Sequence, residues 1–262
     1  MKVSVICLNW NEIEVSKDSV RRLLKEPDLE IVVVDNGSDD GSKEYFRSLG
    51  DKIKFVDLPK NMGASVGRNK GIEVATGENI FLLDGDILYV KGTIAEYQKI
   101  LEMYPDSFCV GQNSIELLYK TCNNGVLEPV DADMSMDTEY KVEDWFPIAW
   151  TQYGLFRGDV LRKLKFVEEG VFGEPGYGFE DDWLYHEAKS LGYVSLAVDK
   201  PMYYHHAHGG LRELHRGKKD IKADERKRLF RKKWGNKNTW ADMLNQPIIE
   251  RTYRKGPNAR LL

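Results

Sequence analysis

Short apolar runs alternate with helical patterns through the first part of the chain. The runs are Lys2 to Leu8, Glu30 to Val34, Lys54 to Leu58 and Asn79 to Leu83. Apolar runs of this length, bounded by glycine, proline or asparagine, indicate buried strands. Between them, residues 15–24, 42–49 and 61–75 have the residue spacing of helices. This alternation predicts an α/β fold with a doubly wound, mostly parallel sheet.

Polar side chains follow the predicted strands, at the edge where ligands bind in sheets of this kind. They are Asn9, Asn11 and Glu12 after the first strand, Asp35 after the second, and Asp84-Gly85-Asp86 after the fourth. Two hard oxygen donors two residues apart, with no His or Cys beside them, suit Mg²⁺ or Mn²⁺ bound together with a phosphate. We expect the glycine between them to leave room for a diphosphate. An ordinary Asp-Gly-Asp turn is the alternative.

Composition excludes several classes of protein. No stretch of the 262 residues approaches the roughly 18 apolar residues of a membrane-spanning helix, so none is predicted. Cys7, Cys109 and Cys122 are widely spaced and odd in number, which fits neither a disulfide framework nor a zinc site and favours a reducing cytoplasm. Neither G-x-G-x-x-G after the first strand nor G-x-x-x-x-G-K-[ST] occurs. The usual dinucleotide-binding fold and the P-loop NTPases are therefore disfavoured.

Four segments carry a resemblance to a known family. VSVICLNWNE, VVVDNGSDDGS, NMGASVGRNKGI and FLLDGD, in this order, resemble the nucleotide-sugar half of glycosyltransferase family 2, whose members have the GT-A fold. The resemblance implies a nucleoside-diphosphate sugar donor, which we expect to be UDP-linked, and a DXD-type metal site for Mn²⁺ or Mg²⁺. The implied nucleotide contacts are Asn9, Asn11, Glu12, Asp35, Asn61, Gly63, Arg68 and Asp84, and the implied metal ligands are Asp86 and Asp84.

A second motif lies in the other half of the chain. Three acids, Glu180, Asp181 and Asp182, follow a glycine-rich stretch at the start of a predicted helix through Lys189. Acids at a helix N-terminus are stabilised by its dipole, which is one explanation for them. The segment also resembles the family's acceptor-side motif W-G-G-E-D, with Phe179 where a glycine is common. By that resemblance Asp181 is the general base, and Glu180 binds an acceptor hydroxyl.

Four of the five histidines lie within residues 205–215. Alternation along a strand would point His206 and His208 to one side and His205 to the other. Relatives often place a histidine here as a metal ligand or diphosphate contact, so we expect that role for His206 or His208. A zinc site of three histidines is the alternative.

The end of the chain is basic. From His215 to Lys237 there are 11 Lys/Arg against 3 Asp/Glu, and 220–234 reads as a helix. We therefore divide the chain into a GT-A domain at 1–215 and a basic helical extension at 216–262. Within the domain, 1–90 is the nucleotide-sugar half and 91–215 the acceptor half. We expect 216–237 to contact an anionic surface, with the protein cytoplasmic or peripheral to that surface, and 247–262 to be a poorly ordered tail.

The leading hypothesis is a metal-dependent glycosyltransferase that inverts the anomeric carbon. Its acceptor would carry a hydroxyl on a glycan, a lipid-linked sugar, a protein or a modified nucleic acid; the sequence leaves the sugar and the acceptor open. A sugar-phosphate nucleotidyltransferase is an alternative, but it would want a glycine-rich basic loop where this chain has Asn-Trp-Asn-Glu. A non-catalytic protein that binds nucleic acid or another anion through the basic segment is a second alternative, and it predicts salt-sensitive binding without turnover.

Overall fold

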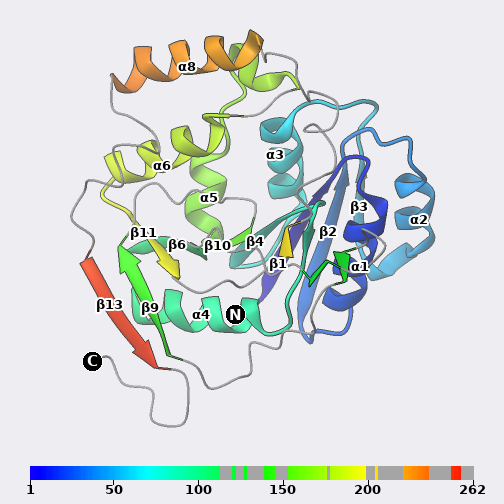
Figure 1. The fold of residues 1–262 in the computed structure, drawn as a ribbon, viewed down its shortest axis with the longest axis horizontal. Coiled ribbons are helices and arrows are strands. Elements are labelled where there is room, and N and C mark those ends of the chain that lie inside the picture. Colours follow the sequence, from blue (N-terminus) through cyan, green and yellow to red (C-terminus); the bar gives the residue numbers. More distant parts are fainter. Residues whose placement is uncertain are drawn as a thin grey trace.

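The fold is a three-layer α/β arrangement built on one large sheet (Figure 1). The computed structural model describes residues 1–112, 120–121, 127–128, 139–144, 153–175, 178–198, 204–205, 221–235 and 249–254. The strands of the large sheet are β1 (Val3–Asn9), β2 (Leu29–Asp35), β3 (Lys54–Asp57), β4 (Asn79–Asp84), β6 (Ser107–Gln112), β9 (Glu139–Asp144), β10 (Tyr153–Arg157), β11 (Val194–Val198) and β13 (Ile249–Arg254). The α-helices are α1 (Ile13–Leu23), α2 (Ser42–Ser48), α3 (Ala64–Val74), α4 (Thr93–Met103), α5 (Gly158–Leu164), α6 (Glu180–Ser190) and α8 (Ile221–Trp234).

The sheet runs in the order β13-β9-β11-β6-β10-β4-β1-β2-β3. Its β4-β1-β2-β3 part is parallel, as the alternation of strands and helices predicts. Beyond β4 the pairing is mixed, because β10 runs antiparallel to both β4 and β6 while β11 runs parallel to β6. Two small ribbons, β5 (Ile87–Leu88) with β12 (Tyr204–His205) and β7 (Lys120–Thr121) with β8 (Leu127–Glu128), lie outside this sheet. Two 3₁₀ turns, η1 (Gly50–Lys52) and η2 (Gly170–Gly173), complete the described elements.

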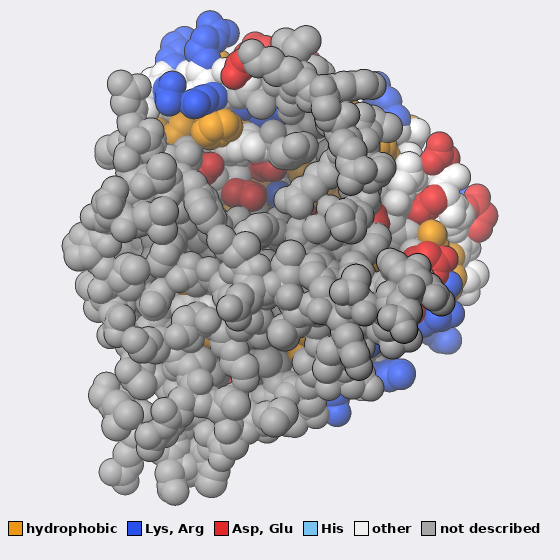
Figure 2. All heavy atoms as spheres, viewed as in Figure 1, with side chains coloured by type: hydrophobic (Ala, Val, Ile, Leu, Met, Phe, Trp, Pro, Cys, Tyr) orange, Lys and Arg blue, Asp and Glu red, His pale blue; other side chains and the backbone are white. Residues whose placement is uncertain are grey.

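The predicted basic helix is confirmed as α8, and it has two different faces. In Figure 1 it lies along the end of the molecule that also carries α6 and α3. Phe230 is fully buried, whereas the side chains of Lys227, Arg228, Arg231, Lys232 and Lys233 are exposed. Figure 2 shows Lys and Arg side chains gathered over this helix. Within the described residues no helix is long and apolar enough to span a bilayer.

The prediction of a poorly ordered tail from residue 247 onward is wrong for 249–254. These residues form β13, which pairs antiparallel with β9 along its whole length, from Ile249 opposite Asp144 to Arg254 opposite Glu139. An edge strand takes its hydrogen bonds from a partner that is distant in sequence, so its own residues carry little signal of it.

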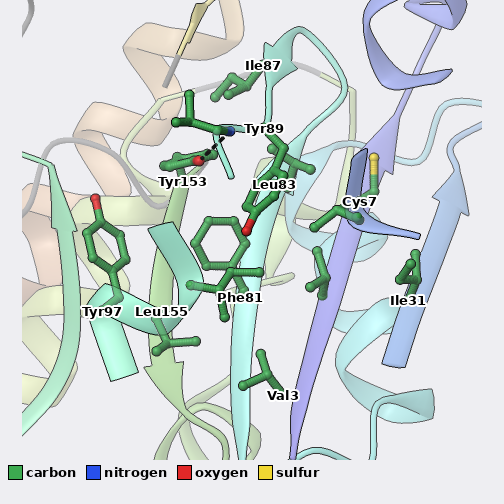
Figure 3. Close-up of a cluster of buried hydrophobic side chains, with 14 of the residues drawn as sticks. Val3, Cys7, Ile31, Phe81, Leu83, Ile87, Tyr89, Tyr97, Tyr153 and Leu155 are labelled. Atoms are coloured by element: carbon green, nitrogen blue, oxygen red, sulfur yellow. Dashed lines mark hydrogen bonds between the residues drawn. The ribbon is translucent and has the colours of Figure 1, made fainter. Parts of the chain in front are cut away.

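The core fills both faces of the sheet, because buried parallel strands present apolar side chains to either side. On one face, Phe81 packs edge-on against Tyr153, with ring centroids 4.8 Å apart (Figure 3). The Tyr153 hydroxyl accepts a hydrogen bond from the Val90 amide at 3.2 Å, which satisfies that polar group in the core. The opposite face holds Ile6, Leu82, Phe108 and Leu184 among others. This rigid sheet fixes the ends of β1, β2 and β4.

Candidate active site

Three predicted site residues meet at the carboxyl edge of the sheet. In the strand register, Asn9 at the end of β1 lies opposite Asp35 at the end of β2, and Leu8 lies opposite Asp84 at the end of β4. From the sequence we expect Asn11, Asp35 and Asp86 to converge at this edge; the register shows that the ends of β1, β2 and β4 lie side by side there, with Asn9, Asp35 and Asp84 as their last residues.

Asp35 holds the loop that follows β2. Its side chain is fully buried, and its Oδ2 accepts a hydrogen bond from Asn9 Nδ2 at 3.0 Å. Its Oδ1 accepts from the backbone amides of Gly37 at 3.2 Å and Ser38 at 2.8 Å. Three protein donors thus satisfy this carboxylate, and a direct contact between Asp35 and a nucleobase stays a prediction.

Asn11 and Glu12 begin the loop after β1. Asn11 has a left-handed backbone with φ 54°. Its amide donates to Ser38 Oγ at 3.0 Å, and its Oδ1 accepts from the Asp39 amide at 2.9 Å, so the first two loops are tied together. The negative charge of Asp86 acts on the Glu12 carboxyl. Burial, with the negative charges of Asp86 and Asp40, raises the pKa of Glu12 to about 8.

The loop before α3 is organised by Asn36, which directly follows β2. Its Nδ2 donates to Asn61 Oδ1 at 3.3 Å and to the Gly63 carbonyl at 3.2 Å, and its Oδ1 accepts from the Met62 amide at 2.8 Å. Gly63 has φ +85°, and a Cβ there would lie 2.5 Å from the Glu174 carbonyl oxygen. Only glycine allows this close approach of the two loops. Asn61 and Gly63 thus occupy a fixed loop beside β2.

Arg68 joins the two predicted half-sites. It lies on α3 with a side chain that is 4% exposed. Its Nη2 donates to both oxygens of Asp84, at 3.0 and 3.2 Å, and its Nη1 donates to Asp181 Oδ1 at 3.2 Å. The guanidinium also lies 5.1 Å from the ring centroid of Phe166. The carboxylates around it hold the pKa of Arg68 above its ordinary value against the effect of burial.

Asp84 and Asp86 differ in their surroundings. The Asp84 side chain is 24% exposed, and burial raises its pKa to about 6, with Arg68 acting in the opposite direction. Gly85, between the two acids, packs closely against β1. A Cβ at Gly85 would lie 2.9 Å from Asn9 Oδ1 and 3.1 Å from the Leu8 carbonyl oxygen. The glycine is therefore required by close packing against the end of β1, and its role in leaving room for a diphosphate stays a prediction.

The donor set at this edge fits a hard divalent cation. Carboxylate oxygens of Asp86 and Asp84 are the available ligands, and Arg68 already engages Asp84. Among the described residues no group of three or more His, Cys, Asp or Glu is arranged around a metal position. This set suits a cation held by one or two carboxylates together with substrate phosphates.

The predicted histidine ligands, His206 and His208, lie outside the described residues. The strand that precedes them is described. In the β12–β5 pair, His205 lies opposite Ile87, the residue that follows Asp86. The backbone leading to the histidine cluster thus lies beside the acidic loop.

Three acids occupy the first turn of α6, as predicted. The Asp181 side chain is 25% exposed and contacts Arg68. Glu180 is 8% exposed and its Oε2 accepts from the Gly178 amide at 2.7 Å, while burial and the charge of Asp181 raise its pKa above the ordinary range. Burial and the charges of Asp181 and Glu180 raise the pKa of Asp182 to about 7. Asp181 is thus the acid of this turn that faces Arg68 most closely.

Phe179 precedes this turn with φ +68°. This left-handed conformation favours glycine, which accounts for the glycine common at the position in the family motif. Here the Phe179 ring packs on Phe230 of α8, with centroids 5.6 Å apart. Two further contacts of the same layer join α6 to α8, since Trp234 lies 6.1 Å from Trp183 and is stacked on His186 at 5.5 Å.

Comparisons with known proteins bear on this geometry. The model of the family described as "Glycosyl transferase family 2" matches residues 4–118, the segment that carries β1 to β4, the acidic loop and Arg68. Residues 4–118 belong to glycosyltransferase family 2. This assignment confirms the resemblance of the four sequence segments.

One curated relative extends beyond that segment. The chain is 36% identical over 182 residues to the uncharacterised glycosyltransferase YibD of Escherichia coli K12, covering 63% of this chain and 52% of YibD. The chain covers 25, 43 and 35% of the length of three further curated relatives. The chain therefore spans about half, or less, of the length of these four curated relatives.

Solved structures of glycosyltransferases share the fold. The mannosyltransferase PcManGT from Pyrobaculum calidifontis, in complex with GDP-Man and Mn²⁺, is 20% identical with a TM-score of 0.59, over 82% of this chain and 59% of that one. S. aureus TarS 1-349, in complex with UDP-GlcNAc, is 20% identical with a TM-score of 0.56, over 88% of this chain and 71% of that one. The predicted GT-A fold is confirmed.

Proposed function

We propose that this family 2 chain transfers a sugar from a UDP-linked donor to an acceptor hydroxyl, with a divalent cation and with inversion at the anomeric carbon. The observation that carries the proposal is the position of Arg68. One guanidinium lies between Asp84 of the nucleotide-sugar half and Asp181 of the acceptor half, with hydrogen bonds of 3.0 and 3.2 Å. This contact supports a single site in which donor and acceptor react.

The proposed donor-binding residues lie at the carboxyl edge of the sheet. Asn9, Asp35 and Asn61 shape the nucleotide pocket, and Asp84 would bind the ribose. Asp86, with Asp84, would hold Mn²⁺ or Mg²⁺, and a bound cation would neutralise the departing diphosphate. One of His206 or His208 would complete this set, which the position of His205 opposite Ile87 supports. TarS, which was solved with UDP-GlcNAc, supports a UDP-linked donor. PcManGT was solved with GDP-Man, so a GDP-linked donor is the alternative to be tested.

In the proposed reaction, the proton is transferred on the acceptor side of the site. The acceptor oxygen attacks the anomeric carbon as its bond to the diphosphate breaks, and Asp181 takes the hydroxyl proton. Glu180 would bind an acceptor hydroxyl. The Arg68 Nη1 donates to Asp181 Oδ1 at 3.2 Å, and this hydrogen bond orients the carboxylate of the proposed base. Attack from the face opposite the leaving group inverts the configuration.

A donor screen tests this proposal. Melting temperature and release of nucleoside diphosphate are followed with UDP-glucose, UDP-galactose, UDP-GlcNAc and GDP-mannose, with and without Mn²⁺. A true donor should raise the melting temperature only with Mn²⁺, because ligand that binds the native state stabilises it. Absence of any response to all four sugars would contradict the proposal.

Two variants test the metal ligand and the general base separately. Asp86→Ala should abolish the Mn²⁺-dependent response. Asp181→Asn should retain donor binding and lose turnover by about 100-fold or more, the typical contribution of a general base. Asp159→Asn is the matched control, since Asp159 is an exposed acid in the first turn of α5. Wild-type turnover in Asp181→Asn would show that the base is another group.

A second proposal concerns binding by the basic segment near the end of the chain. We infer that residues 216–237 contact an anionic surface, because the exposed face of α8 carries Lys227, Arg228, Arg231, Lys232 and Lys233. Binding to vesicles with anionic lipid should exceed binding to neutral vesicles and fall with added salt. Equal binding to both kinds of vesicle would refute it, and tight binding to nucleic acid without sugar turnover would favour the alternative of a non-catalytic anion-binding protein.

A further inference from the structure

Arg226 is a buried arginine of α8 that binds backbone. Its side chain belongs to the inner face of the helix, and the residue is 1% exposed. Its Nη2 donates to the carbonyl oxygens of Val171 at 2.8 Å, Glu174 at 3.2 Å and Pro175 at 3.4 Å. These carbonyls lie in and just after the short turn η2 and have no sheet partner, so the guanidinium fixes the path of this loop.

The loop that Arg226 holds touches the donor side. The Glu174 carbonyl lies against Gly63, where an added Cβ would come within 2.5 Å of the carbonyl oxygen. Gly63 stands immediately before α3, and its own carbonyl accepts from Asn36 at 3.2 Å. The Glu174 carbonyl thus lies between Arg226 and the loop that carries Asn61 and Gly63.

The same helix supports the acceptor side. Phe230, one turn after Arg226, packs on Phe179, which is held at φ +68° directly before Glu180 and Asp181. In Figure 1, α8 lies across the end of the molecule to which α3 and α6 also belong. A helix from the far end of the chain therefore contacts both the loop that packs on Gly63 and the residue that precedes the acids of α6.

We propose that Arg226 is a positioning residue that sets the distance between the donor loop at Gly63 and the base Asp181. The proposal rests on the proposed function. Without the guanidinium, the loop at 171–175 loses three hydrogen bonds, and the Glu174 carbonyl is no longer fixed against Gly63 at the start of α3. The loop that carries Asn61 and Gly63 stays tied to the end of β2 by the hydrogen bonds of Asn36, so the nucleotide pocket keeps its shape.

This predicts a split between binding and turnover. Misplacing a catalytic group by about 1 Å can cost about 100-fold in rate. We expect Arg226→Ala to lower the rate of donor hydrolysis or transfer by about 10- to 100-fold, while Kd for UDP with Mn²⁺ changes by less than about 3-fold. Arg226→Lys, which keeps the charge but cannot reach three carbonyls with one planar fork, should fall in between.

The matched control is Arg157, which makes the same kind of contact elsewhere. It donates to the carbonyl oxygens of Ser107 at 2.6 Å, Leu101 at 2.6 Å and Tyr104 at 3.3 Å, joining β10 to α4 and β6. Arg157→Ala should lower the melting temperature about as much as Arg226→Ala and leave the turnover rate per folded molecule nearly unchanged. Methylguanidinium added to Arg226→Ala should restore part of its turnover and none in a doubly substituted Arg226→Ala, Asp181→Asn protein.

The outcomes are distinguishable. Turnover by Arg226→Ala that matches Arg157→Ala, or a loss of UDP affinity in proportion to turnover, would overturn the positioning role while the proposed function stands. If Arg226→Ala does not fold, the Arg226→Lys variant decides on the same two measurements. Failure of the wild-type protein to bind UDP with Mn²⁺ or to turn over any nucleotide sugar would overturn the proposed function and this inference together.

Discussion

Arg68 carries the positive charge that lies between Asp84 and Asp181. Its replacement by methionine removes that charge and both sets of hydrogen bonds. Three carboxylates surround the guanidinium, with Asp84 at 3.0 Å, Asp181 at 3.2 Å and Glu180 at 3.9 Å. Removal of one partner from a buried ion pair costs about 3–5 kcal/mol, because the remaining charges stay buried without compensation. We expect Arg68→Met to lower the free energy of unfolding by about this amount at pH 8.

The loss should depend on pH in a defined direction. Burial already raises the pKa of Asp84 to about 6 from an ordinary value of 3.8, even with Arg68 beside it. A carboxyl whose pKa is higher in the folded state destabilises the fold when ionised, so the penalty is absent below about pH 4 and complete above about pH 6. Without Arg68 the pKa rises further, and at pH 5 the carboxyl is protonated. The loss should then shrink to about 1–2 kcal/mol.

Urea unfolding at pH 8 and pH 5 measures both values. The control is Arg21→Met, since Arg21 pairs with Asp18 at 3.6 Å with side chains 54 and 55% exposed. That change should cost less than about 0.5 kcal/mol at either pH. A loss in Arg68→Met that is equal at the two pH values, or below about 1 kcal/mol at pH 8, would refute the view of Arg68 as the counter-charge of a buried carboxylate cluster.

Three further changes test particular features. Asp182→Asn should raise the free energy of unfolding by about 1–3 kcal/mol at pH 8 and change it little at pH 4, because burial raises the Asp182 pKa to about 7; calorimetry showing no gain at pH 8 would contradict this. Gly85→Ala should cost about 1–3 kcal/mol in urea unfolding, since the new methyl meets Asn9 Oδ1 at 2.9 Å, and an unchanged stability would disprove that packing. Phe230→Ala should cost about 3–5 kcal/mol, because the ring is fully buried; a loss under 1 kcal/mol would mean that α8 does not pack on α6.

The nucleotide-sugar half could be predicted because its signals are local. The runs that form β1 to β4 are mostly apolar, and each strand begins and ends within two residues of its expected position. Parallel strands joined by helices bring their carboxyl ends to one edge, so it follows from order alone that the polar residues after β1, β2 and β4 gather there. The acids of α6 were found for the same reason, as a cluster at a helix start.

Contacts between distant segments could not be predicted. The sequence singled out Arg68 and Asp181 separately, as a pocket residue and a base, but 113 positions separate them and no local pattern pairs them. Arg226 was one basic residue among many in a charged helix, with nothing to mark it as the buried one. Its carbonyl partners have no sequence signature, because every residue has a carbonyl.

The sequence by itself therefore determined the parallel sheet, the edge at which polar residues gather, and the family to which residues 4–118 belong. Periodicity and turn residues act over a few positions, and a strand or helix start can be recognised from them. Only the tertiary structure decided that Arg68 bridges two half-sites, that Gly85 packs on β1, that β13 joins the sheet and that α8 braces the loops. Each of these depends on packing between segments far apart in the chain, where close contact and burial, rather than local pattern, select the partner.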